Sequence, residues 1–144
     1  MQSNKSRRRL LVIEDNPTDV LLLRRALTKH GVDYEMVVVE DGEEAIEYLE
    51  QCKAEGKPEL IIVDLNLPKE DGLEVLKVYR GSPSFVETQM VILTSSDSPS
   101  ERQRAEIIGV DAYLRKPIEL DAFLALGDTL RKLLELPPKP LSVI

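Results

Sequence analysis

The sequence lacks the features of a secreted or membrane-spanning protein. Its one cysteine, Cys52, excludes an internal disulfide, the usual support of small secreted domains. No apolar run approaches the roughly 18 residues that a membrane-spanning helix needs, and no apolar signal segment follows Met1. We therefore expect a cytoplasmic protein that has no membrane partner.

Basic residues are outnumbered by acidic ones outside the first few residues. The 144-residue chain has a net charge of −7, whereas residues 1–9 contain four basic residues and no acid. The other residues together carry −11, the difference between −7 and +4. A body this acidic repels the phosphates of nucleic acids, so we expect no nucleic-acid partner. We interpret residues 1–8 as a short basic tail.

Short apolar runs alternate with helical patterns along the chain. The strands are expected at residues 9–13, 34–39, 60–63, 89–93 and 112–114. The helices that follow them are expected to begin near Asn16, Asp41, Asp71, Ser98 and Glu119. Five such alternations are typical of one parallel sheet with helices on both faces, the α/β, doubly wound, flavodoxin-like (βα)5 fold. We assign this domain to residues 9–136 and a Pro-rich tail to residues 137–144.

The expected strand at 60–63 leads directly into a candidate reactive group. All four of its residues are apolar, as in a strand buried on both faces, and Asp64 comes next. Other strands run into Glu14-Asp15, Thr94 and Lys116. A lone acid at a strand end is usually a solvated turn or a helix cap. These ends, however, share one edge of a parallel sheet, the edge where ligands bind in open α/β folds.

These residue types suit phosphoryl chemistry. Clustered carboxylates repel one another and need a cation. Oxygen ligands without a nearby His or Cys favour Mg²⁺ over zinc or copper. Lys116 can lie opposite as a point charge, and Thr94 can donate a hydrogen bond to the same group. The set suits a nucleophile, Asp64, that accepts a phosphoryl group.

At these positions the sequence resembles the receiver domains of bacterial two-component response regulators. The resemblance extends from about Arg9 to Leu136. The matching motifs occur in the order found in that family: Glu14-Asp15, Asp64 with Asn66 and Pro68, Asp71-Gly72, Thr94-Ser95, Tyr113 and Lys116-Pro117.

The resemblance implies a function for each of these groups. A partner sensor histidine kinase would donate a phosphoryl group to Asp64, in an Mg²⁺-dependent transfer that the receiver itself catalyses. Asp15, Asp64 and the backbone carbonyl of Asn66 would coordinate the metal, with Glu14 acting through water. Beyond this transfer and slow self-dephosphorylation we expect no enzyme activity.

The resemblance also implies a conformational switch. Phosphorylation would draw Thr94 inward, Tyr113 would turn into the vacated space, and the fourth helix, fifth strand and fifth helix would respond. The Lys116-Pro117 peptide bond is typically cis in this family. Asn66 and Ser96 flank the path of the attacking water, so we expect them to influence the lifetime of the phosphoryl group.

The chain ends soon after the expected fifth helix, so its output is expected to be a partner, self-association or onward phosphotransfer. Residues 15–20 most resemble regulators that serve bacterial, often cyanobacterial, phytochrome kinases. The last helix has more apolar residues than one inward stripe needs: Leu120, Phe123, Leu124, Leu126, Leu130, Leu133, Leu134 and Leu136. We predict a homodimer through the fourth helix, fifth strand and fifth helix.

Three other functions can be compared with this one. A phosphorelay intermediate or phosphate sink fits the sequence as well, since only phosphoryl lifetime and reverse transfer distinguish it from a switch. A small aspartyl-phosphate phosphohydrolase would need an Asp two residues after Asp64, but Asn66 stands there. A flavin carrier would need aromatic residues around its ring, but the sequence has no Trp and only 4% aromatic residues.

Overall fold

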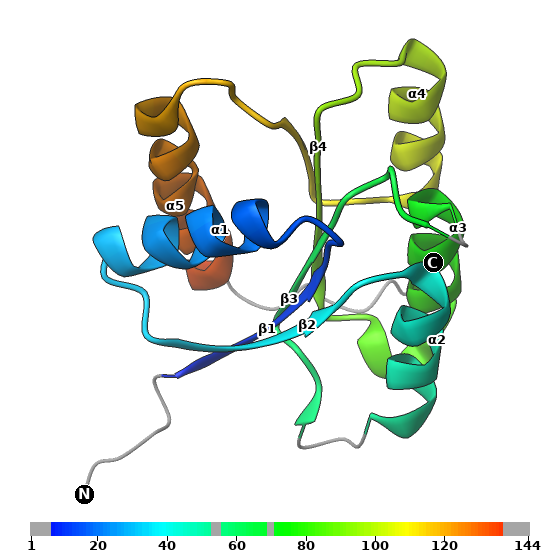
Figure 1. Ribbon diagram of the computed structural model, residues 1–144. Coiled ribbons are helices and arrows are strands. Elements are labelled where there is room, and N and C mark those ends of the chain that lie inside the picture. The colour runs from blue at the N-terminus through cyan, green and yellow to red at the C-terminus, as the bar shows by residue number, and fades with distance from the viewer. Residues whose placement is uncertain (1–6, 53–55, 69–70, 137–144) are drawn as a thin grey trace, which may run out of the picture.

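Residues 7–52, 56–68 and 71–136 are described in a computed structural model of the protein, and they contain one five-stranded sheet (Figure 1). Its order is β2-β1-β3-β4-β5. The strands are β1 (Arg8–Ile13), β2 (Tyr34–Val39), β3 (Leu60–Val63), β4 (Gln89–Thr94) and β5 (Ala112–Arg115). All neighbouring strands run parallel, so their carboxyl ends lie at one edge. The predicted fold is confirmed.

Helices cover both faces of this sheet. They are α1 (Pro17–Lys29), α2 (Gly42–Gln51), α3 (Gly72–Arg80), α4 (Pro99–Ile108) and α5 (Leu120–Glu135). Helices α1 and α5 lie on one face, and α2, α3 and α4 lie on the other (Figure 1). A short 3₁₀ turn, η3 (Pro83–Phe85), precedes β4 and was not predicted.

The two layers of helices hold β3 between them. Leu60 and Ile62 pack in the cluster beneath α1 and α5, whereas Ile61 and Val63 pack in the cluster beneath α2, α3 and α4. All four side chains are buried, which explains the unbroken apolar run in the sequence. The next residue, Asp64, is thereby held at a fixed place on the carboxyl edge.

Side-chain caps begin several helices directly at this edge. Asn16 Oδ1 accepts a hydrogen bond from the Thr18 N–H at 2.9 Å, and Asp71 Oδ1 accepts one from the Leu73 N–H at 3.0 Å. Each cap satisfies a backbone donor that has no partner inside its helix. Helices α1 and α3 therefore begin at the edge of the sheet that carries the candidate site.

Strand boundaries differ slightly from the prediction. Strand β1 begins at Arg8, one residue earlier, and both β4 and β5 end one residue later. The extension of β4 and β5 arises because Thr94 and Arg115 still pair across the two strands.

The predicted tails at residues 1–8 and 137–144 fall almost wholly outside the described residues. Within the described part of the chain, no helix is long and apolar enough to cross a membrane.

The apolar excess of α5 is smaller than its sequence predicts. Phe123, Leu130 and Leu134 are buried, and of the other leucines in the predicted set only Leu120 and Leu136 count as exposed, each by about half. The reason is close packing against α1, because a Cβ atom on Gly127 would lie only 2.1 Å from the Ala26 carbonyl oxygen. This approach covers side chains that one inward stripe would leave in water.

Candidate phosphoacceptor site

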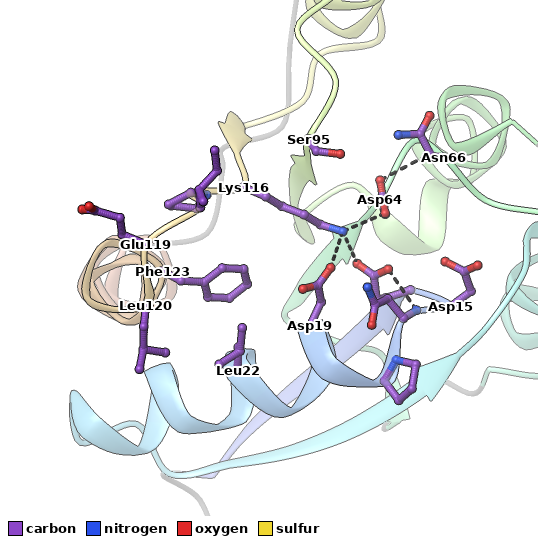
Figure 2. A pocket seen from close by; sticks show the side chains of 15 residues that line it. Asp15, Asp19, Leu22, Asp64, Asn66, Ser95, Lys116, Glu119, Leu120 and Phe123 are labelled. Carbon is purple, nitrogen blue, oxygen red and sulfur yellow. Dashed lines mark hydrogen bonds and ion pairs between the residues drawn. The ribbon is translucent and has the colours of Figure 1, made fainter.

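A pocket of about 790 Å³ opens at the carboxyl edge of the sheet (Figure 2). One wall is charged and includes Glu14, Asp15, Asp19, Asp64 and Lys116. The opposite wall is apolar, with side chains from α1, from the loop between β5 and α5, and from the start of α5: Leu22, Pro117, Ile118, Leu120 and Phe123. The groups that the sequence predicts at three different strand ends thus share one cavity.

The ammonium of Lys116 is the centre of this pocket. It lies 3.0 Å from Glu14 Oε1, 2.9 Å from Asp64 Oδ2 and 2.7 Å from Asp19 Oδ2 (Figure 2). An ammonium has three N–H groups and no acceptor. Three carboxylates therefore occupy all of the hydrogen bonds that Lys116 can donate.

Burial and charge change the ionisation of this cluster. Glu14 is only 3% exposed. Burial, partly offset by the hydrogen bond from Lys116, raises the pKa of Glu14 to about 7, and the neighbouring charge of Asp64 contributes to the rise. For Lys116, burial acts to lower the pKa, but hydrogen bonds to Asp19, Asp64 and Glu14 raise it above its usual range. Lys116 therefore stays charged, whereas Glu14 titrates near neutral pH.

The carboxylate of Asp64 is held at both of its oxygens. Oδ1 accepts a hydrogen bond from the Asn66 N–H at 3.1 Å, and Oδ2 accepts one from Lys116. The loop is supported from below by Gly72, where a Cβ atom would lie 2.7 Å from the Asp64 carbonyl oxygen. A side chain at position 72 would push this loop away. This steric conflict explains why the predicted Asp71-Gly72 motif has a glycine at its second position.

The acidic residues also form a candidate metal centre. Glu14, Asp15 and Asp64 can each direct a carboxylate oxygen into a group whose members lie within 4.8 Å of one another. Asp15 is exposed, so a bound ion could keep water ligands. A donor set of carboxylate oxygens and water fits Mg²⁺ or another hard divalent cation. The carbonyl of Asn66 was also predicted as a ligand, and Asn66 lines the same pocket.

Thr94 and Tyr113, the predicted switch residues, do not line this pocket. Thr94 is fully buried, and its Oγ1 accepts a hydrogen bond from the Ser96 N–H at 3.2 Å. Tyr113 packs against the core on the side of α2, α3 and α4, beneath the guanidinium of Arg102, which lies 4.5 Å from the ring centroid. The neighbouring Ser95 lines the pocket instead.

The structure also bears on the expectations for the Lys116-Pro117 bond and for Ser96. The Lys116-Pro117 peptide bond is trans rather than cis, the form that most X–Pro bonds in folded proteins adopt. Ser96, predicted to affect phosphoryl lifetime, does not line the pocket. Its hydroxyl donates to Glu101 Oε1 at 2.6 Å, which directs the side chain toward α4.

Asp19 is a site residue that was not among those predicted from the sequence. It lies in the first turn of α1, four residues after Asp15. The Cα–Cβ bonds in a helix are tilted toward its N-terminus, and α1 begins at the carboxyl edge of the sheet. An acid in the first turn of this helix is therefore a signal that could have been recognised.

Comparison with known proteins identifies the family. A family model described as the response regulator receiver domain matches residues 10–126. The chain belongs to this receiver family. The matched residues include the acidic pair after β1, the predicted acceptor Asp64 after β3 and the lysine after β5.

Relatives of this receiver include other regulatory proteins of similar sequence. The sequence is 33% identical over 110 residues to Response regulator Rcp1 of Synechocystis sp., covering 74% of this chain and 75% of Rcp1. It is also 33% identical over 114 residues to the probable methanogenesis regulatory protein FilR2 of Methanothrix harundinacea, covering 78% of this chain and 74% of FilR2.

Solved structures give the same result. The phosphorylated cyanobacterial phytochrome response regulator RcpA superposes with a TM-score of 0.79 and 32% identity, covering 88% of this chain and 92% of RcpA. The Mn²⁺-bound form of Rcp1 superposes with a TM-score of 0.81 and 29% identity, covering 93% and 99%. A divalent cation is thus bound in a receiver of closely similar fold.

Proposed function

We propose that this receiver accepts a phosphoryl group on Asp64 from a partner sensor histidine kinase, with Mg²⁺ as the required ion. The observation that carries the proposal is the position of the Asp64 carboxylate. It contacts the ammonium of Lys116 at 2.9 Å and belongs, with Glu14 and Asp15, to the acidic group that can converge on a metal. With Mg²⁺ held by that group, the nucleophile would have two positive centres beside it and could approach an anionic donor without strong repulsion.

The pocket residues would divide the work of an in-line transfer. An oxygen of Asp64 forms a bond to phosphorus while the bond from phosphorus to the donor imidazole breaks, and that bonding pair stays on the imidazole. Mg²⁺ held by Glu14, Asp15 and Asp64 would neutralise charge on the transferred group. Lys116 would donate to a phosphoryl oxygen, and the Asn66 N–H holds the loop in place.

The proposed response is a shift between two conformations in which Thr94 and Tyr113 move. Thr94 has no solvent exposure, so its inward movement would require Tyr113 to repack in the same layer. Homodimerisation through α4, β5 and α5 would follow. The exposed Ile107 of α4, at 79%, supports this surface. Light scattering that shows a monomer at high micromolar concentration, with and without a phosphoryl mimic, would contradict the dimer.

The partner kinase is proposed to be of the phytochrome type. Support comes from the similarity to RcpA, a cyanobacterial phytochrome response regulator. A phosphotransfer profile against all histidine kinases of the source organism tests this choice. If the phosphoryl group instead returns rapidly to the kinase and no partner responds, a phosphorelay intermediate or phosphate sink becomes the better description.

Replacement of Asp64 by Asn tests the central proposal. Wild-type protein with acetyl phosphate and Mg²⁺ should gain one phosphoryl group, and both the Asp64→Asn variant and a sample treated with a chelator should gain none. Labelling that persists in the variant would show that another residue accepts the phosphoryl group. The phosphohydrolase alternative predicts continuous release of phosphate from small donors, and the absence of an acid at Asn66 argues against it.

A further inference from the structure

Asp19 makes the shortest of the three contacts to the Lys116 ammonium, at 2.7 Å. The pair joins the first turn of α1 to the loop after β5, residues that are far apart in the chain. Both side chains are largely withdrawn from water, with 12% exposure for Lys116 and 16% for Asp19. An ion pair at this depth is screened much less by salt than one at the surface.

Among the residues that the structure describes, Lys116 is the partner found for the Asp19 carboxylate. The N-terminus of α1 is capped by Asn16, whose Oδ1 accepts from the Thr18 N–H, so the Asp19 side chain is not needed as the cap. Asp19 is also absent from the acidic group that can converge on a metal. Its carboxylate is directed at the lysine (Figure 2).

The other two acceptors of Lys116 have a second use in the proposed function. Glu14 and Asp64 belong to the candidate metal group, and Asp64 would also carry the phosphoryl group. When a metal and a phosphoryl group engage these two carboxylates, Asp19 is the remaining acidic partner of the ammonium. Lys116 without Asp19 would then be free to sample other rotamers of its long side chain.

We propose that Asp19 is a positioning residue, which holds the Lys116 ammonium in the pocket while its other hydrogen bonds pass from Glu14 and Asp64 to the transferred phosphoryl group. This inference rests on the proposed function for its catalytic part. The pairing of Asp19 with Lys116 can be measured independently of any phosphorylation.

Kinetics with acetyl phosphate at saturating Mg²⁺ test the catalytic part. Asp19→Ala and Asp19→Asn should each lower the maximal rate of Asp64 phosphorylation by about tenfold, because a displaced catalytic group costs rate. Asp19→Glu should recover part of it, since the charge is retained. Glu74→Gln is the matched control: Glu74 is an acid in the first turn of α3 that pairs with Arg104 at 3.4 Å, away from the pocket, and should leave the rate unchanged.

A double-variant comparison separates positioning from general loss of structure. If Asp19 acts through Lys116, Asp19→Ala should cause no further slowing in a Lys116→Ala background. Equal slowing in both backgrounds would overturn the proposal, and so would an unchanged or increased rate in Asp19→Ala alone. The increase would mean that Asp19 competes with the phosphoryl group for the lysine.

The ammonium signal of ¹⁵N-labelled Lys116 tests the pairing in the metal-free protein. It should be visible in the wild type, assigned by its loss in Lys116→Ala, retained in Glu74→Gln and broadened by faster proton exchange in Asp19→Asn and Asp19→Ala. An identical signal in all Asp19 variants would refute the positioning role. If the wild type shows the predicted signals but is never phosphorylated, the pairing stands and the proposed function fails.

Discussion

The pocket and the face formed by α4 and β5 are both rich in charge, but they are built differently. In the pocket, Lys116 contacts three carboxylates at 2.7–3.0 Å, and these four side chains are 3–16% exposed. On the other face, Asp97 contacts Arg102 at 3.5 Å and Arg115 at 3.2 Å, with half or more of each side chain exposed. The same kinds of residue therefore act in different dielectric surroundings.

This difference separates a rigid centre from a surface that can rearrange. Partner loss inside the pocket leaves an uncompensated buried charge, which is costly. Partner loss on the surface is offset by water and salt, and such pairs contribute little stability. We expect large effects from changes in the pocket and small effects from changes around Tyr113, where low cost allows a switch between two conformations.

Glu14 should produce the largest stability effect, through pH. Because its folded pKa of about 7 lies above the ordinary 4.5, the stability it contributes is complete below pH 4.5 and is lost as pH rises through 7. Without metal, the loss is on the order of 3 kcal/mol. Denaturant unfolding in chelator at several pH values should show this fall in the wild type and lack it in Glu14→Gln. Parallel curves for the two proteins would contradict the burial of an ionising Glu14.

Removal of Lys116 should affect transfer and switching more than folding. Lys116→Ala should retain its circular dichroism spectrum but accept a phosphoryl group from acetyl phosphate about a hundredfold more slowly, as loss of one preorganised donor does. The phosphorylated variant should also fail to change its self-association. A normal dimer response by light scattering would show that Lys116 does not transmit the signal.

Loss of Arg102 should destabilise the protein less than a change in the pocket does, although Arg102 has two contacts. Arg102→Ala removes the guanidinium over the Tyr113 ring and the ion pair with Asp97, and should lower the free energy of unfolding by about 0.5–1 kcal/mol. High salt should reduce this difference. A loss as large as that expected for the pocket would remove the distinction between the two regions.

The smallest effect is expected at the hydroxyl of Tyr113. Within the described residues this buried oxygen has no hydrogen-bond partner, so Tyr113→Phe removes a polar group without breaking a contact. The free energy of unfolding, measured by thermal denaturation, should change by less than about 0.5 kcal/mol in either direction. A marked destabilisation would indicate that the hydroxyl is hydrogen-bonded in solution.

The sequence predicts the fold well because burial and spacing are local signals. The unbroken apolar run at Leu60–Val63 gave the central strand, and Asn16 and Asp71 marked helix starts that the structure confirms by their capping bonds. Because the carboxyl ends of parallel strands share one edge of the sheet, the sequence also predicts that Glu14 and Lys116 lie close together, and the structure places them 3.0 Å apart. Parallel strand order makes this convergence predictable without coordinates.

The remaining features depend on three-dimensional packing. The part that Asp19 plays follows from the direction of one side chain in α1, and the covered leucines of α5 follow from the close approach at Gly127. That Ser95 rather than the buried Thr94 lines the pocket is likewise visible only in the structure. Of these features, only the acid in the first turn of α1 has a signal in the linear sequence.

Chemical mapping of the phosphorylated residue tests the proposed function most directly. The wild-type protein is incubated with acetyl phosphate and Mg²⁺, reduced with borohydride to convert an acyl phosphate into a homoserine, and digested for mass spectrometry. Conversion should be confined to Asp64 and should disappear when the metal is chelated. Conversion at another acid of the pocket, such as Asp15 or Asp19, would contradict the assignment of Asp64 as the acceptor.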